Sequence, residues 1–208
     1  MTMPQLHLEA LEMMERVRLR QPEFWYGTRV RNSPQSCEDR IAKGYVFLGD
    51  DTYIWIPICP ISIPENNTKA VGVVFKVDQQ CVFTDSYLEI VVPEPDSRAG
   101  KTDPKLHSYL KGLAGSLKGP LRKSRTKYNC YRITIPTGGN AIQSVEQWLN
   151  ANLPTILKHL TGFTSTVKPH AMVYTRQIMA SNIDRFLKAR GPVNDATSKK
   201  LQVVRSKI

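Results

Sequence analysis

Residues 45–58 read YVFLGDDTYIWIPI, a segment that predicts a β-hairpin. Its two arms, 45–48 and 52–58, are rich in aromatic and β-branched side chains, which favour strands. Between them, residues 49–51 (Gly-Asp-Asp) supply the small and polar side chains of a tight turn. Because a turn this short joins only antiparallel strands, we expect antiparallel pairing in the sheet around it.

Four more strands are predicted towards the C-terminus. Residues 71–77 and 81–83 flank a polar Asp-Gln-Gln turn and predict a second hairpin. Residues 87–92 predict a fifth strand, which ends where two prolines follow, and residues 128–135 predict a sixth. Proline is rarely accommodated inside a sheet, so the two prolines mark an end of this β-rich region.

Helical periodicity is found on both sides of the predicted sheet. Pro22 should end the N-terminal helix, because proline removes a helical hydrogen bond, and Pro154 should bend the helix that follows the last strand. The four predicted helices cover residues 4–20, 104–117, 142–160 and 171–190.

This order of elements predicts an α+β fold. We expect an antiparallel sheet of about five to six strands, from residues 44–93 and 128–135, flanked by N-terminal, middle and C-terminal helices. A chain of 208 residues suits one domain of this kind. We place that domain at residues 1–165, followed by a basic C-terminal helix and tail at residues 166–208.

The composition indicates a globular protein of the cell interior. Hydrophobic residues make up 41% of the chain and charged residues 23%, which is enough to build a core. No run of 18 apolar residues predicts a membrane helix, and charges interrupt the first 21 residues, so no signal peptide is predicted. The four cysteines form no CxxC pair, which argues against a zinc site. We expect a cytoplasmic protein in a reducing compartment, with no membrane partner.

The sequence contains no motif for covalent chemistry. Residues 112–119 have the glycines of a phosphate-binding loop but not its Lys-Ser/Thr ending, and Ser116 lacks the flanking glycines of a nucleophile elbow. We therefore predict no cofactor and no enzymatic activity. A metal-dependent nuclease is the alternative. Its acids would be either Asp96 and Asp103, with Lys105 as the lysine of an acid-x-Lys pattern, or Asp78, Asp85 and Glu89 at the hairpins.

The formal net charge of +11 is unevenly distributed along the chain. Residues 33–96, the predicted sheet, carry four basic and ten acidic side chains, whereas residues 97–132 carry ten basic and one acidic. Residues 168–208 add nine basic and two acidic side chains. Concentrated positive charge attracts polyanions, and lysine and arginine release condensed counterions when they bind DNA or RNA phosphates. Residues 97–132 are therefore the first candidate for nucleic-acid contact.

Residues 118–128 are the densest part of this basic segment. They combine five cations with three hydroxyl side chains, which favours a phosphate-binding loop. A flexible connector kept soluble by its charge is the alternative interpretation, and the basic C-terminal tail has the same two interpretations. The predicted phosphate contacts are Arg98, Lys101, Lys111, Lys118, Arg122, Lys123, Arg125, Lys127, Arg132, Lys199 and Lys200.

Aromatic side chains beside cations suggest a second kind of contact. Proteins use this combination to stack on unpaired bases. Residues 24–26 (Phe-Trp-Tyr) precede Arg29 and Arg31, and Tyr128 adjoins the basic segment. The stacking candidates are Trp25, Tyr26 and Tyr128, although adjacent aromatics after a helix also suit the end of a hydrophobic core.

One weak resemblance concerns the order of the elements. The chain resembles small α+β domains found beside restriction-type nucleases in bacteria and phages. The resemblance lies in the order of strands and helices, which ends with a strand that contains Tyr131, Arg132 and Ile133 and then a helix that contains a tryptophan. It covers residues 45–160, shares no diagnostic motif and transfers no site residue. It implies phage, mobile-element or defence biology.

These observations predict a non-enzymatic nucleic-acid-binding protein that is largely indifferent to base sequence. DNA or RNA is the expected partner, together with protein subunits of a larger nucleoprotein complex. The alternative is an assembly subunit or inhibitor that docks on an acidic protein surface.

Overall fold

The computed structural model describes residues 1–27, 44–60, 71–92, 112–117, 121–123, 129–162, 180–181, 183–185, 187–188 and 196–206. Its elements are α1 (Met3–Arg20), β1 (Phe24–Tyr26), β2 (Leu48–Asp50), β3 (Tyr53–Pro60), β4 (Val71–Val77), β5 (Phe83–Val92), β6 (Leu121–Lys123), β7 (Asn129–Thr134), α4 (Ala141–Gly162) and α6 (Ala196–Arg205). Residues 112–116 and the described residues between 180 and 188 are also helical.

The strands of the described chain belong to one antiparallel sheet, in the order β1-β3-β4-β5-β7-β6. Strand β2 pairs with the N-terminal half of β3, where Leu48 faces Trp55, and β1 pairs with its C-terminal end, where Trp25 faces Cys59. Strand β6 precedes β7 in the sequence and forms the far edge of the sheet. The predicted α+β class, with an antiparallel sheet and N-terminal, middle and C-terminal helices, is confirmed.

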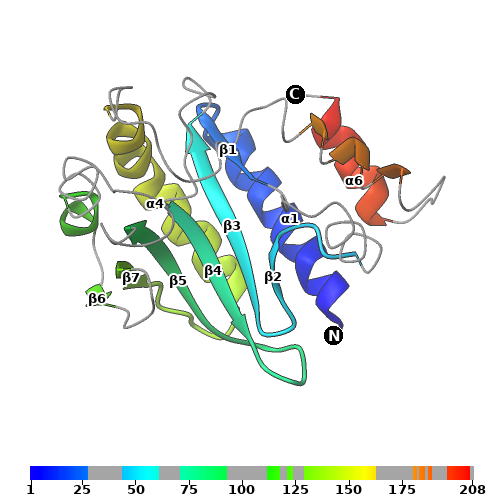
Figure 1. The fold of residues 1–208 in the computed structure, drawn as a ribbon, viewed down its shortest axis with the longest axis horizontal. Helices are drawn as coiled ribbons and strands as arrows, with labels where there is room; N and C mark the ends of the chain where they lie inside the picture. Colours follow the sequence, from blue (N-terminus) through cyan, green and yellow to red (C-terminus); the bar gives the residue numbers. More distant parts are fainter. Residues whose placement is uncertain are drawn as a thin grey trace.

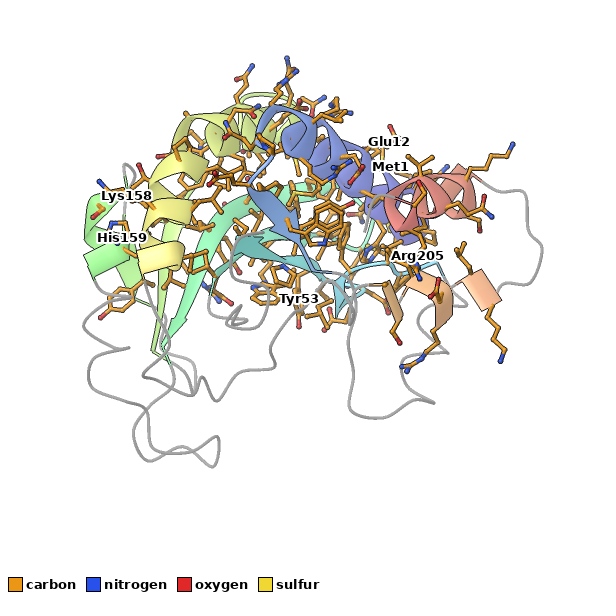
Figure 2. All side chains as sticks on the ribbon, turned by 90° about the horizontal axis from the view of Figure 1, so that it is seen from above. Met1, Glu12, Tyr53, Lys158, His159 and Arg205 are labelled. Atoms are coloured by element: carbon orange, nitrogen blue, oxygen red, sulfur yellow. The ribbon has the colours of Figure 1, made fainter. Side chains whose placement is uncertain are left out.

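Helices α1 and α4 cover one face of the sheet, and α6 lies beside α1 (Figure 1, Figure 2). Successive side chains of a strand point to opposite faces. In β3 and β4, Ile54, Ile56, Val73 and Phe75 are fully buried and belong to the cluster that includes the buried residues of α1. The main hydrophobic core therefore lies between this face and the helices.

Polar side chains near both helix starts explain where α1 and α4 begin. The Oε1 atom of Gln5 accepts a hydrogen bond from the Thr2 backbone N–H at 2.7 Å. The Oδ1 atom of Asn140 accepts one from the Gln143 N–H at 3.0 Å, as an N-cap residue does. Pro154 lies exposed within α4, which continues on both sides of it from Ala141 to Gly162.

The predicted strand at residues 45–48 differs from the structure, because β2 begins only at Leu48. The N–H of Phe47 donates to Nδ1 of His7 in α1 at 3.2 Å, so this backbone group bonds to a side chain instead of a neighbouring strand. Tyr45 stacks on the same imidazole, with ring centres 5.0 Å apart. The apolar run signalled burial, and the pairing that we inferred from it was wrong for residues 45–47.

The predicted strand 87–92 is part of a longer strand, β5, which begins at Phe83, so of the strand predicted at 81–83 only its last residue is in a strand. Lys76 pairs with Asp85 and Val77 with Phe83, with an irregularity in register between the two pairs. Thr84 and Asp85 are exposed members of a continuous strand, so their polarity did not mark a turn.

The short strands β1 and β6 were not predicted. Each has three residues, and β6 lies inside the segment 118–128 that we expected to form a loop. A three-residue strand carries little periodicity, and its pairing depends on a partner strand elsewhere in the chain. Pairing with β7 therefore orders residues 121–123 as the edge strand of the sheet.

Other predicted elements are only partly within the described residues. In the helix predicted over residues 104–117, the structure describes 112–117, and 112–116 are helical. In the helix predicted over residues 171–190, it describes only the residues between 180 and 188 given above, which are helical. The basic tail contains α6, in which Ser198 and Leu201 are buried. Among the described helices, none has the length and apolar content needed to cross a bilayer.

Candidate nucleic-acid interface

The face of the sheet that points away from α1 and α4 carries a separate group of side chains. We call it the second face. Tyr53, which belongs to it, lies on the opposite side of the sheet from the two helices (Figure 2). The strand registers place the remaining members in rows across the sheet. The second face includes Tyr53, Trp55, Val74, Lys76, Tyr87, Glu89 and Arg132.

The centre of the second face is a small hydrophobic cluster. Trp55, Val74 and Tyr87 lie on three neighbouring strands and are buried. The indole of Trp55 extends over Gly72, where a Cβ atom would come within 2.6 Å of Cε2 of the ring. The indole N–H is buried and makes no hydrogen bond within the described part of the chain. The cluster is therefore a packed centre, and the charged side chains lie around it.

Arg132 is held in place by two side chains of the neighbouring strand β5. It pairs directly with Glu89 across the strands, and its Nε donates to Oε2 of that carboxylate at 3.0 Å. It lies diagonally across from Tyr87, and its guanidinium carbon is 4.6 Å from the centre of that ring. Directly opposite side chains lie close together, and diagonal neighbours are within reach of long and aromatic side chains, which explains the two contacts in turn. The Arg132 side chain remains 32% exposed, whereas that of Glu89 is 15% exposed.

A second arginine occupies the neighbouring position on the edge strand. The β6–β7 register sets Arg122 directly across from Arg132 and Lys123 across from Tyr131. Glu89, Arg132 and Arg122 thus form one row across β5, β7 and β6. Residues directly opposite each other in an antiparallel pair lie on the same face, so two positions of like charge are adjacent here.

Of the predicted phosphate contacts, Arg122, Lys123 and Arg132 are brought together at the β6–β7 pair. Lys199 is exposed on α6, and Lys200 follows it in the same helix. The structure does not join these two lysines to the β6–β7 pair. The candidates that lie outside the described residues are Arg98, Lys101, Lys111, Lys118, Arg125, Lys127 and the stacking candidate Tyr128.

The other two stacking candidates lie in the core. Trp25 is 5% exposed and Tyr26 is fully buried, both on β1. The Tyr26 hydroxyl donates to Oε1 of Glu15 at 2.6 Å, and the guanidinium of Arg18 lies 5.2 Å from the Trp25 ring centre. Burial, followed by the charge and the hydrogen bond of Glu15, raises the pKa of Tyr26 well above its ordinary value. Rings covered in this way offer no face to a base, so the two aromatics are used for packing.

The carboxylates considered for a nuclease are separated along the hairpin that joins β4 and β5. Oδ1 of Asp78 accepts the N–H groups of Gln80 and Val82 at 2.9 Å each, and Glu89 is paired with Arg132. In the described ranges, no group of three or more His, Cys, Asp or Glu side chains could hold a metal ion. Asp96, Asp103 and Lys105 lie outside these ranges.

One contact of chemical interest was not predicted from the sequence. Nε2 of His159 in α4 lies 3.1 Å from Oγ of Ser116, in the helical segment 112–116. The Ser116 hydroxyl also donates to the Gly112 carbonyl at 2.9 Å. Whether the serine or the imidazole donates in their own contact depends on the tautomer of His159. The pair links α4 to the helical segment 112–116.

Sequence reasoning found Arg132 but missed Glu89 and Tyr87 as its partners. The two β5 residues are separated from Arg132 by more than 40 positions, and only the register of β5 on β7 joins them. Alternation within residues 87–92 would place Tyr87 and Glu89 on one face, which was the only signal available.

Comparison with known proteins found no matching family model, no matching curated protein and no matching solved structure. The resemblance to domains beside restriction-type nucleases therefore has no support beyond the order of elements.

Proposed function

We propose that this protein binds DNA or RNA without catalysing a reaction, through phosphate contacts from residues 97–132. The register that sets Arg122 across from Arg132 carries the proposal. Like charges directly opposite each other destabilise an antiparallel pair. A phosphate beside the two positions would remove this repulsion, so the arrangement suits a protein that spends part of its time bound to an anion.

The row across β5, β7 and β6 has a net positive charge. Glu89 is paired with Arg132 and neutralises one of the two arginines. Lys123 follows Arg122 on the same edge strand and adds a further cation. A basic edge strand also resists pairing with strands of other proteins. The β6–β7 pair therefore combines the edge position in the sheet with excess positive charge.

The rest of the sheet favours confinement of a polyanion to this edge. Residues 33–96 carry four basic and ten acidic side chains and so repel phosphate. Contacts to phosphates carry no information about bases, so we propose weak discrimination between base sequences. Such partners are met inside the cell, and we propose a cytoplasmic location.

The salt dependence of binding tests this function. Fluorescence anisotropy would follow labelled DNA and RNA, single- and double-stranded, across a salt series. Replacing Arg122, Lys123, Arg125 and Lys127 with Ala should lower the slope of log affinity against log salt by roughly three to four units, if each makes one phosphate contact. The loss of affinity should be similar for unrelated base sequences.

A matched control removes the same number of charges elsewhere. Replacing Lys43, Lys69, Lys158 and Lys188 with Ala lowers the net charge equally but leaves the β6–β7 edge intact, so the slope should change far less. Circular dichroism would confirm that both variants fold. No detectable binding by the native protein would overturn the proposed function, and an unchanged slope in the first variant would move the contacts away from this edge.

A further inference from the structure

We infer that Arg132 is a positioned, two-pronged donor for a single phosphate group, and that Glu89 and Tyr87 are its positioning residues. The inference rests on the proposed function and specifies the ligand chemistry of its central contact. It starts from the two groups that contact the guanidinium, a carboxylate and an aromatic ring, and from the register of the neighbouring edge strand.

The two contacts of Arg132 restrict different motions of the guanidinium. The bond from Nε to Glu89 Oε2, at 3.0 Å, fixes the position of the near end of the group. The ring of Tyr87, 4.6 Å from the guanidinium carbon, covers one side of the group. Both partners lie on one face of β5, two residues apart, so a single strand supplies both contacts. An arginine restrained in this way has less freedom to lose when it binds a ligand.

The donors that remain point to the chemistry of the ligand. Within the described part of the chain, the hydrogen bond of Arg132 to Glu89 uses Nε, and none is made by the two terminal nitrogens. These nitrogens form the fork that binds two oxygens of a phosphate through parallel hydrogen bonds. The side chain is 32% exposed, which leaves this end within reach of a ligand. Arg122 occupies the register position directly opposite Arg132 on β6.

The chemical class of the ligand is therefore a phosphate group with two free oxygens. A phosphodiester of a nucleic-acid backbone has such a pair, and so does a free phosphate. The excess of basic side chains in residues 97–132 favours the backbone of a polymer, because a single free phosphate uses only one or two of these cations.

Exchange of arginine for lysine tests the fork separately from the charge. Arg132→Lys keeps the positive charge, so the salt slope for DNA or RNA binding should stay unchanged. The affinity should fall by about tenfold, because an ammonium cannot make two parallel bonds. Arg132→Ala should lower the affinity further and reduce the slope by about one unit. Full affinity in the Arg132→Lys protein would overturn the inference and leave the proposed function standing, whereas absence of binding by the native protein would remove the proposed function itself.

Substitutions of Tyr87 test the positioning role without any change of charge. Tyr87→Leu removes the ring beneath the guanidinium and should weaken binding several-fold at an unchanged salt slope, whereas Tyr87→Phe keeps the ring and should restore native affinity. Urea unfolding would establish the conditions under which each variant is folded. Equal affinities of folded Tyr87→Leu and Tyr87→Phe proteins would contradict a positioning role.

The source of the phosphate is distinguished by competition. Inorganic phosphate should displace labelled nucleic acid from the native protein only as strongly as sulfate at equal ionic strength, which is the result expected for a polymer ligand. Displacement by inorganic phosphate at far lower concentration than by sulfate would overturn the assignment to a nucleic-acid backbone.

Discussion

Gly72 leaves the space that the indole of Trp55 fills on the second face. A Cβ atom at this position would lie 2.6 Å from Cε2 and 2.8 Å from Cζ2 of the ring, and 2.9 Å from the Ile56 carbonyl oxygen. Two of these atoms belong to a buried ring and the third to a strand backbone, so none can move without disturbing the β3–β4 pair. The glycine is required here by close approach of neighbouring atoms.

Gly72→Ala should therefore destabilise the fold by about 1–3 kcal/mol, the usual effect of excess volume in a packed site. The free energy of unfolding in urea measures it. Gly115→Ala is the matched control, because Gly115 is exposed and helical and its added Cβ would meet nothing within 4 Å. We expect this control to be as stable as the native protein or slightly more so. Equal losses in the two variants would show that the space beside Trp55 is not tightly filled.

Single residues also show why the stacking candidates could not be assigned from the sequence. Trp25 and Tyr26 stand near several arginines in the chain, a pattern that suits both base stacking and core packing. The structure places both rings in the core, where Glu15 accepts a hydrogen bond from the Tyr26 hydroxyl. The deciding contact crosses from β1 to α1, and such a contact leaves no mark on local sequence pattern.

At the scale of elements, long strands with clear alternation were predictable and short paired segments were not. Residues 71–77 and the sixth strand agree with β4 and β7 because each has its own run of strand-forming side chains. Strand β6 has three residues, two of them basic, and forms because β7 lies beside it. The sequence therefore predicted the positive charge of the candidate site. The geometry of the site depends on the pairing of β6 with β7, which the sequence does not reveal.

The β6–β7 pair gives a prediction in which stability and binding change in opposite directions. Arg122→Thr removes the like charge across from Arg132 and introduces a residue that favours strands. At low salt it should raise the free energy of unfolding by about 0.2–1 kcal/mol. The gain should shrink as added salt screens the repulsion in the native protein. Affinity for nucleic acid should fall at the same time, as measured by anisotropy.

Lys123→Thr is the control within the same strand. It removes the same charge and adds the same side chain, but the residue across from it is Tyr131. Relief of repulsion is therefore absent, and the salt-dependent gain in stability should be absent too. A lower stability of the Arg122→Thr protein at low salt, or the same gain in both variants, would contradict the view that opposed arginines are maintained for binding.

At the scale of the whole molecule, the chain separates its charges by segment. The β-rich residues 33–96 are acidic, whereas residues 97–132 and 168–208 are basic. This separation was visible in the sequence, since charge needs no knowledge of the fold. The fold adds that β6 and β7, which carry part of the basic segment, complete the sheet at the edge next to β5. The acidic and basic segments thus share one sheet, and the basic one occupies its far edge.

The separation of acidic and basic segments predicts nucleic-acid binding that is independent of metal ions. Two of the three carboxylates considered on the β4–β5 hairpin are engaged, Asp78 with backbone N–H groups and Glu89 with Arg132. Labelled DNA and RNA incubated with the protein and Mg²⁺ or Mn²⁺ should stay intact on a denaturing gel.

Binding should not require a metal ion either. A chelator should leave the affinity for nucleic acid unchanged, and millimolar Mg²⁺ should weaken binding, because the ion competes with lysine and arginine for phosphates. Sodium chloride at matched ionic strength is the control for screening. Cleavage that requires the metal and disappears in Asp96→Asn or Asp103→Asn would instead establish a nuclease whose acids lie outside the described residues, and would refute the non-enzymatic proposal.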